Sequence, residues 1–273
     1  MARRLAVLAG RGPLPAVVID AARASGREVF VLAFEGETDA ALVDGLPHAW
    51  VPLGAVGRAL RTLHESGAEE VVMVGPVRRP ALATLQLDAR GMQLLARLGL
   101  RGRGDDRLLQ AIVKELEREG FRVLGADDLI GALLAPEGLL TRAVPDRQAA
   151  LDIALGATVA ARLGELDVGQ AVVVQQGLVL GVEAVEGTDR LLERSAELRR
   201  DGPGGVLVKL KKPGQERRAD LPTIGPATVA GAATAGLAGI AVHAGNCLIV
   251  ERERTIEAAD RVGLFLLGIA GPG

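Results

Sequence analysis

The residues best suited to chemistry lie in one basic stretch of the second half of the chain. Within ten residues the sequence places five cations: Lys209, Lys211, Lys212, Arg217 and Arg218. A carboxylate, Asp220, follows them and opens the segment Asp-Leu-Pro-Thr-Ile-Gly, which includes Thr223. Clustered cations favour an anionic ligand, and an acid at their border could hold a metal ion or activate a water molecule. The alternative is a basic hairpin whose aspartate is only an ion-pair partner.

A second set of acids follows an apolar run at residues 178–185. Glu183 alternates with apolar neighbours in this run, and Glu186, Thr188 and Asp189 come where a helix is expected to begin. Mg²⁺ takes oxygen ligands and usually needs only one or two carboxylates, with water and substrate phosphates completing its shell. This cluster is therefore a candidate metal site, and a capped helix with solvated acids is the alternative.

Two glycine-containing loops follow predicted strands in the first half of the chain. Gly10, Gly12 and Leu14 lie in Gly-Arg-Gly-Pro-Leu-Pro, where glycine lets the backbone approach a phosphate at the start of a helix. Gly75 and Arg79 lie in Gly-Pro-Val-Arg-Arg-Pro at the end of another strand. Open α/β sheets bind ligands at such ends, and an arginine there can hold phosphate with two hydrogen bonds. Plain turns with solvated arginines are the alternatives.

The first of these loops matches only the front of the dinucleotide-binding fingerprint. The third glycine is missing, position 15 is proline, and Glu35 and Glu37 lie only near the place where the fingerprint has its acid. The sequence therefore does not favour NAD as a ligand.

Asp105 and Asp106 follow Gly104 at the start of another predicted helix. Aspartate at a helix start accepts hydrogen bonds from free N–H groups and interacts favourably with the helix dipole. Two adjacent carboxylates could instead bind a divalent ion or a sugar hydroxyl.

The composition narrows the classes of function. The chain has 273 residues, of which 49% are apolar and 24% charged, so it has ample material for a core. One Trp, four Phe, no Tyr and a net charge of −2 argue against a base-stacking platform or a face that binds nucleic acid. The single cysteine, Cys247, lies in an apolar run and is expected to be a buried small hydrophobe.

Short apolar runs alternate with helical patterns along the first half. Such runs separated by helices indicate a parallel sheet covered on both faces. The expected strands are residues 5–9, 29–34, 49–53, 70–75 and 121–125, and the expected helices are residues 14–25, 54–66, 88–98 and 105–119. The second half combines a hairpin, residues 171–175 and 178–185, with further helices and strands. The predicted fold class is α/β, with a parallel-sheet domain followed by a mixed α/β domain.

Two further segments bear on the organisation of the chain, one as a linker and one as a possible membrane span. Residues 133–145 have no clear period and carry prolines near both ends, so they are expected to link a domain at residues 1–132 to one at residues 146–273. Residues 221–250 contain no Asp, Glu, Lys or Arg, which is long enough to suggest a membrane span. Their two prolines and five glycines favour a buried helix, at about residues 226–236, followed by two short strands.

The ordered motifs together resemble a known family. The segments GRGPLP, GPVRRP, GDDRLL, VLGVEAVEGTD, KKPGQERRADLPTIG and GLFLLGI are similar to those of the LpxI-type UDP-2,3-diacylglucosamine pyrophosphatases of Gram-negative lipid A synthesis. The resemblance runs from about residue 5 to about residue 270. It implies a Rossmann-like first domain that binds the nucleotide, a catalytic second domain, and cleavage to UMP and 2,3-diacylglucosamine 1-phosphate (lipid X) with a divalent metal, usually Mg²⁺.

The resemblance also implies roles for single residues. The acid required for catalysis falls on Asp220. From the residues themselves, the candidate metal carboxylates are Asp220, Glu186 and Asp189. Substrate contacts are expected at Gly10, Gly12, Leu14, Gly75, Arg79, Asp105, Gln176, Gly177, Thr188, Lys212, Arg218 and Thr223. Because the chain has no tyrosine, the uracil is expected to be held by backbone hydrogen bonds and aliphatic contacts. Arg11 departs from relatives with a small residue there, and it could add a phosphate contact or crowd the loop.

Two other functions remain open from the residues alone. A non-catalytic nucleotide or lipid sensor would use the same glycine loops and capped helices, and a nicotinamide oxidoreductase is suggested only by the first loop. The chain is expected to be cytoplasmic, with peripheral contact at the inner membrane. It is expected to form a homodimer and to have no nucleic-acid partner.

Overall fold

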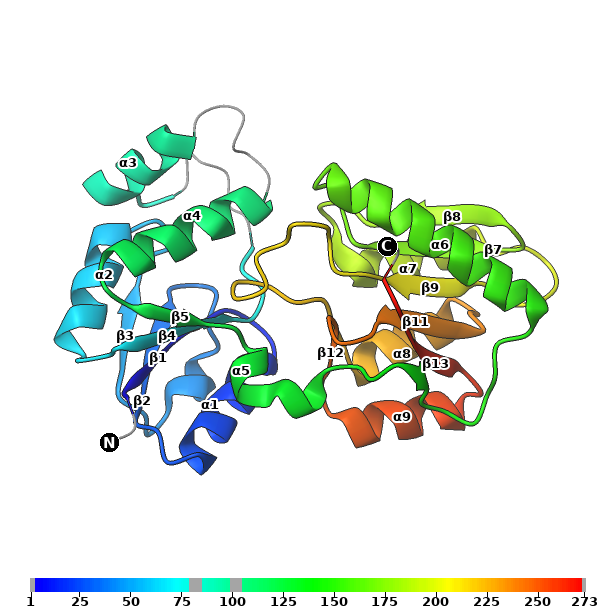
Figure 1. Cartoon of the computed structure of the whole chain (residues 1–273), viewed down its shortest axis with the longest axis horizontal. Helices are drawn as coiled ribbons and strands as arrows, with labels where there is room; N and C mark the ends of the chain where they lie inside the picture. The colour runs from blue at the N-terminus through cyan, green and yellow to red at the C-terminus, as the bar shows by residue number, and fades with distance from the viewer. Residues whose placement is uncertain (1–2, 79–84, 99–104, 272–273) are drawn as a thin grey trace. The chain divides into compact units, whose positions relative to one another are not determined.

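The chain folds into two compact units. The structure, a computed structural model, describes residues 3–78, 85–98 and 105–271. Unit 1 comprises Met1–Gly131 and Glu216–Asp220, and unit 2 comprises Ala132–Gln215 and Leu221–Gly273 (Figure 1). The chain therefore passes between the units three times, after residues 131, 215 and 220.

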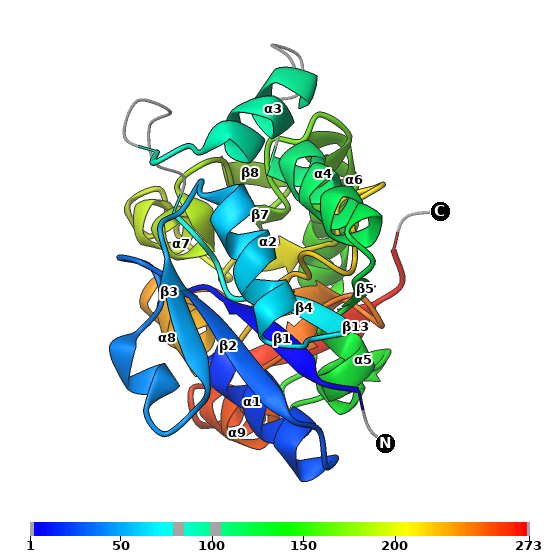
Figure 2. The same cartoon turned by 90° about the vertical axis from the view of Figure 1, so that its left-hand side faces the viewer.

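Unit 1 is built on a parallel sheet of five strands in the order β3-β2-β1-β4-β5. Figure 2 shows β3, β2, β1 and β4 side by side. The strands are β1 (Leu5–Ala9), β2 (Val29–Phe34), β3 (His48–Val51), β4 (Glu70–Val74) and β5 (Arg122–Leu124). In register, Leu5 of β1 lies opposite Val29 of β2 and Glu70 of β4. From β1 the chain first adds strands on one side, β2 and β3, and then adds β4 and β5 on the other side, so the strand order changes direction between β1 and β4.

Helices cover both faces of this sheet, as the unbroken apolar strands require. The helices of unit 1 are α1 (Leu14–Ala24), α2 (Val56–Glu65), α3 (Ala89–Leu98), which packs on α2 and α4, α4 (Asp105–Arg118) and α5 (Asp127–Ile130), with a 3₁₀ turn, η1, at Ala40–Val43. Ala6 and Leu8 of β1 pack with Leu60 of α2 and Leu116 of α4. The alternate side chains of β1 face the other side, where α1 and α5 lie (Figure 1).

Unit 2 contains a mixed sheet of six strands in the order β6-β13-β11-β9-β7-β8. Strands β9, β11 and β13 are parallel, whereas β6 and β7 run antiparallel to their neighbours. The strands are β6 (Gly138–Leu139), β7 (Ala171–Gln175), β8 (Leu178–Val182), β9 (Val206–Lys209), β11 (Gly239–His243) and β13 (Phe265–Ile269). A separate parallel pair joins β10 (Thr223–Ile224) and β12 (Leu248–Ile249).

The second sheet also has two covered faces. Ile153 and Ala160 of α6 (Arg147–Glu165) pack with Val172 and Val208 on one face. The other face packs against α7 (Gly187–Glu197), α8 (Pro226–Thr234) and α9 (Arg252–Arg261), through side chains that include Leu191. Figure 1 shows α6 on one side of the sheet and α8 and α9 on the other.

The α/β fold class and the parallel first sheet are confirmed. The uncharged stretch at residues 221–250 forms α8, β11 and β12, as predicted, and no described helix is long and apolar enough to cross a membrane. Cys247 is fully buried, and burial raises the pKa of its thiol to about 12, against the opposing effect of the Lys209 ammonium.

The boundaries between the units differ from the predicted ones in two places. The expected linker at residues 133–145 contains β6, whose Leu139 pairs with Leu267 of β13, so it forms part of the second sheet. The segment Glu216–Asp220 is expected in the second domain but belongs to unit 1, because its side chains and backbone bond to residues of that unit. Both differences arise from contacts between residues that are far apart in the sequence.

Candidate active site

The candidate ligand-binding edge of unit 1 is the carboxyl edge of its sheet between β1 and β4. The strand order changes direction there, and open α/β sheets bind ligands in the crevice that such a change leaves. Gly10 follows β1 directly, and Gly75 follows β4 directly. The structure therefore brings the two predicted glycine loops to one point.

The two loops lie in direct backbone contact. The N–H of Gly10 donates to the Val74 carbonyl at 2.8 Å, and the N–H of Arg11 donates to the Pro76 carbonyl at 2.9 Å. A Cβ on Gly10 would lie 2.3 Å from the Gly75 carbonyl oxygen, and one on Gly75 would lie 2.6 Å from that of Arg11. Gly75 also has φ of +87°. Both positions therefore require glycine.

The start of α1 adds free N–H groups to this edge. Gly12 has φ of +79° and turns the chain into the helix, whose N-cap, Pro13, makes no side-chain capping bond. In the first turn Leu14 and Ala16 carry an N–H, whereas Pro15 does not. Such groups have no partner inside the helix and favour an anion.

Arg11 and Arg78 both bond to Glu37, which follows β2. Arg11 Nε donates to this carboxylate at 2.8 Å, and the backbone N–H and Nε of Arg78 donate at 2.9 and 3.2 Å. Burial opposes ionisation of Glu37, but these hydrogen bonds outweigh it and lower its pKa. Arg11 is thus held by Glu37 and by the Gly36 carbonyl.

Two of the predicted site residues lie wholly or partly outside the described residues. Arg79 lies outside the described residues. Asp105 begins α4, but its side chain is outside the described part.

The turn Glu216–Asp220 also lies at the carboxyl edge of the first sheet. A Cβ on Gly125, which follows β5, would lie 3.6 Å from the Arg218 Cα. Ala219 packs against the core under α2 and α4. The exposed Asp220 thus belongs to the same edge as the glycine loops.

Arg218 and Lys212, two of the predicted phosphate-binding cations, are paired with carboxylates. Nε and Nη2 of Arg218 donate to Glu216 at 2.9 and 3.0 Å, and Nη1 donates to Glu117 at 2.6 Å. These hydrogen bonds raise the pKa of Arg218. In unit 2, Lys212 Nζ donates to Asp167 at 2.6 Å. A phosphate bound by either cation would have to join or replace these partners.

Unit 2 brings together two predicted residues, Thr188 and Thr223, through a lysine. Lys209 Nζ donates to the Thr188 hydroxyl at 2.9 Å and to the Thr223 carbonyl at 3.1 Å, and Thr188 donates in turn to Glu183 at 2.5 Å. Lys209 is 7% exposed and Glu183 is 6% exposed. Sequence reasoning counted Lys209 among the cations of the basic stretch and missed this link. The alternation of side chains along a strand could have predicted it, because Lys209 lies two residues after the buried Leu207 and therefore on the same face of the sheet.

Gln176 and Gly177 have a structural role at the other end of this sheet. They form the turn between β7 and β8, and the buried Asp152 accepts both of their N–H groups, at 2.8 and 2.7 Å. Thr188 comes after the far end of β8. Five-residue strands span roughly 16 Å, so the turn and the Thr188 group lie at opposite edges of the sheet. The structure does not bring these predicted contacts together.

The predicted metal ligands are divided between the units. Asp220 belongs to unit 1, whereas Glu186 and Asp189 belong to unit 2, and no three His, Cys, Asp or Glu side chains of the described residues are grouped to hold a metal. Glu186 accepts a hydrogen bond from Arg194 at 2.8 Å, and its own backbone N–H and Arg194 lower its pKa. Carboxylate oxygens suit Mg²⁺, so Asp220 fits as one ligand beside water and phosphate, and Glu186 and Asp189 stay predicted ligands.

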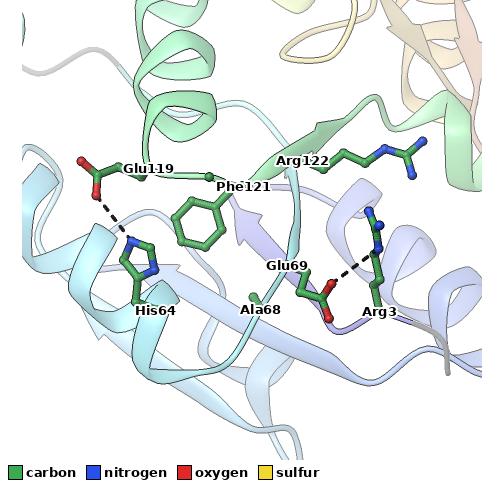
Figure 3. A pocket seen from close by; sticks show the side chains of 8 residues that line it. Arg3, His64, Ala68, Glu69, Glu119, Phe121 and Arg122 are labelled. Atoms are coloured by element: carbon green, nitrogen blue, oxygen red, sulfur yellow. Dashed lines mark hydrogen bonds and ion pairs between the residues drawn. The ribbon is translucent and has the colours of Figure 1, made fainter.

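A surface pocket of about 320 Å³ lies at the opposite edge of the first sheet (Figure 3). It is lined by residues that precede β1, β4 and β5, among them Arg3, Glu69 and Phe121. In Figure 3 His64 lies beside Phe121 and points to Glu119, 3.4 Å away. The pocket is lined by both acidic and basic side chains, and it lies at the opposite end of the strands from the glycine loops.

The parallel sheet and its glycine loops define unit 1 as a Rossmann-like fold, which is followed by a mixed α/β unit. The LpxI N-terminal domain family matches residues 4–133, and the LpxI C-terminal domain family matches residues 136–267. The chain is 43% identical over 274 residues to the UDP-2,3-diacylglucosamine pyrophosphatase LpxI of Caulobacter vibrioides, covering 98% of each chain. The chain therefore belongs to the LpxI family, as the motifs predict.

Solved structures resemble the chain more distantly. Bordetella bronchiseptica WbmG, in complex with NAD and UDP, is 14% identical with a TM-score of 0.38, over 100% of this chain and 83% of that one. The biotin carboxylase domain of Hydrogenobacter thermophilus 2-oxoglutarate carboxylase is 12% identical with a TM-score of 0.29, over 72% and 42%.

Proposed function

We propose that this protein hydrolyses the pyrophosphate bond of UDP-2,3-diacylglucosamine in lipid A biosynthesis. The products are UMP and 2,3-diacylglucosamine 1-phosphate (lipid X). The observation that carries the proposal is that both halves of the chain match the family and that a relative with 43% identity has this activity in its name.

The carboxyl edge of the first sheet supports binding of the nucleotide phosphates. A Cβ on Gly12 would meet no atom within 4 Å, which leaves room for a phosphate to approach the backbone, and the first turn of α1 offers the N–H of Leu14. Arg11 and Arg78 share the single carboxylate of Glu37, so one positive charge remains beside these backbone donors and also favours a phosphate.

Asp220 is the residue we propose for catalysis. Water attacks one phosphorus, a new P–O bond forms, and the bridging P–O bond breaks, so that the bridging oxygen leaves with the other phosphate. One proton of the attacking water must leave during this step, and a carboxylate within hydrogen-bond reach accepts it. Asp220 is exposed on the edge that carries the glycine loops, which suits that role.

We also propose a divalent metal, preferably Mg²⁺, with Asp220 as its protein ligand. When bound, the metal would neutralise the charge that develops on the pyrophosphate oxygens. Glu186 is already bonded to Arg194, so it is the weaker second ligand, and Asp189 is the remaining predicted carboxylate.

The test is release of UMP from purified protein and UDP-2,3-diacylglucosamine, followed by mass spectrometry. We expect release with Mg²⁺ and none with excess EDTA. Asp220→Asn should bind substrate and fold normally but lose turnover, whereas the control Asp44→Asn, at an exposed position of the same unit, should behave as wild type. Thermal stabilisation by substrate with no UMP from the wild type would instead favour a non-catalytic sensor.

A further inference from the structure

The turn that ends at Asp220 is a short excursion of the chain into unit 1. Its neighbours Gln215 and Leu221 belong to unit 2, whereas Glu216–Asp220 belongs to unit 1. Within it, the N–H groups of Ala219 and Asp220 both donate to the Glu216 carbonyl, at 3.0 and 3.1 Å. The backbone therefore forms one closed turn, and the position of Asp220 follows from the position of Glu216.

Two aspartates on different elements hold this turn. Asp106, in the first turn of α4, accepts the N–H of Glu216 at 2.8 Å. Its second oxygen accepts from Gln110 at 2.6 Å, which fixes the carboxylate. Asp127, at the start of α5, accepts from Arg217 Nε at 2.8 Å.

The anchors differ in how strongly water competes with them. The Asp127 side chain is 14% exposed and that of Arg217 is 36% exposed, so their pair is largely shielded. The third contact, between Arg218 and Glu117, is 37% and 44% exposed, and such pairs contribute little. Only Ala219 of the turn joins the core. Among the contacts of the described residues, Asp106 and Asp127 are therefore the anchors whose loss should loosen the turn without unfolding unit 1.

We infer that Asp106 and Asp127 are positioning residues for Asp220. The inference rests on the proposed function, in which Asp220 is the catalytic carboxylate. Both oxygens of Asp106 bond to the turn or to Gln110, one oxygen of Asp127 bonds to the turn, and the other Asp127 oxygen is buried, so each aspartate acts through Asp220 rather than on the substrate. Their removal should impair turnover more than substrate binding, since a misplacement of about 1 Å can cost up to ~100-fold in rate.

The first test compares Asp106→Ala with the isosteric Asp106→Asn. Asparagine keeps an oxygen that can accept the N–H of Glu216, whereas alanine does not. We expect Asp106→Ala to lower kcat by about 10- to 100-fold with KM changed less than about threefold, and Asp106→Asn to restore kcat to within about threefold of wild type. The matched control is Asp39→Ala, which removes a similar side-chain bond, to the N–H of Ala41, away from the turn.

The second test concerns the ion pair. Asp127→Ala and Arg217→Ala should each lower kcat, and the double variant should be no worse than the lower single variant, because both act through one contact. In every Ala variant, hydrogen exchange of the peptide covering Glu216–Asp220 should accelerate at least about tenfold, while exchange in the sheet strands stays unchanged.

The outcomes separate the two ideas. Wild-type protein that releases no UMP contradicts the proposed function, and the exchange data still report whether the aspartates hold the turn. Active wild type overturns the positioning inference if Asp106→Ala and Asp127→Ala keep normal kcat, if Asp106→Asn is as poor as Asp106→Ala, or if exchange at the turn is unchanged.

Discussion

Alanine in place of Gly10 should damage both the stability of unit 1 and its activity. The new Cβ would lie 2.3 Å from the Gly75 carbonyl oxygen and 2.7 Å from that of Pro76, where an ordinary contact begins at 3.4 Å. Both contacts are with backbone, so no side chain can rotate away. The two loops must therefore separate by about 1 Å, as overpacked sites do when the backbone shifts.

The expected cost follows from what that separation disrupts. Overpacking costs about 1–3 kcal/mol, and each of the two hydrogen bonds between the loops, from Gly10 and Arg11, contributes about 1 kcal/mol. We expect Gly10→Ala to lower the free energy of unfolding by about 2–4 kcal/mol. A shift of about 1 Å at the proposed nucleotide site should also lower turnover by up to ~100-fold.

Urea denaturation followed by tryptophan fluorescence measures the effect in the correct unit. The only tryptophan, Trp50, lies in β3 of the first sheet. The control is Gly131→Ala, since a Cβ there meets no atom within 4 Å and its φ is −55°. That variant should be neutral or stabilised by about 0.4–1 kcal/mol. A Gly10→Ala protein with the midpoint and kcat of Gly131→Ala would refute the close-approach argument.

Three further predictions test other parts of the structure. Asp152→Ala leaves two N–H groups of the β7–β8 turn without acceptors, so it should lower the free energy of unfolding of unit 2, measured in urea, by about 2–4 kcal/mol. The folded variant should keep the kcat of wild type. A lower kcat at unchanged stability would indicate that the turn takes part in the active site. Glu37→Gln should lower the free energy of unfolding by about 1 kcal/mol at pH 7. Because the native pKa of Glu37 is lowered from an ordinary value of 4.5, that stabilisation is present above pH 4.5 and lost as the pH falls through the lowered pKa, so wild type and variant should converge in acid; a constant difference contradicts the ion pairing with Arg11. Cys247, whose pKa is about 12, should resist iodoacetamide at pH 8 in native protein and react fully in urea, and rapid native labelling would contradict its burial.

Periodicity and turn chemistry predict most of the fold, because they act over short distances. The buried strands of both sheets, the helix at Pro226–Thr234 and the glycine loops all follow from neighbouring residues. The elements that sequence reasoning missed, β6, β10 and α5, have two to four residues each, too few to show a period. β6 forms only because β13 offers it an edge.

The site was predicted less completely, for the same physical reason. The glycine loops at Gly10 and Gly75 meet because the ends of parallel strands must meet, which sequence reasoning can anticipate. The pairing of Arg217 with Asp127 joins residues 90 positions apart, and nothing near either residue signals it. Gln176 could have been separated from Thr188, since a hairpin turn and the exit of its second strand lie at opposite ends.

The three passages of the chain between its units limit how the protein can be divided. A fragment that ends at Gly131 would contain every strand of the first sheet and yet lack Asp220. A fragment that begins at Ala132 would carry Asp220 without Asp106 or Asp127 to anchor it. Exchange of the first half with that of a relative would therefore have to include residues 216–220, which lie within the second half of the chain.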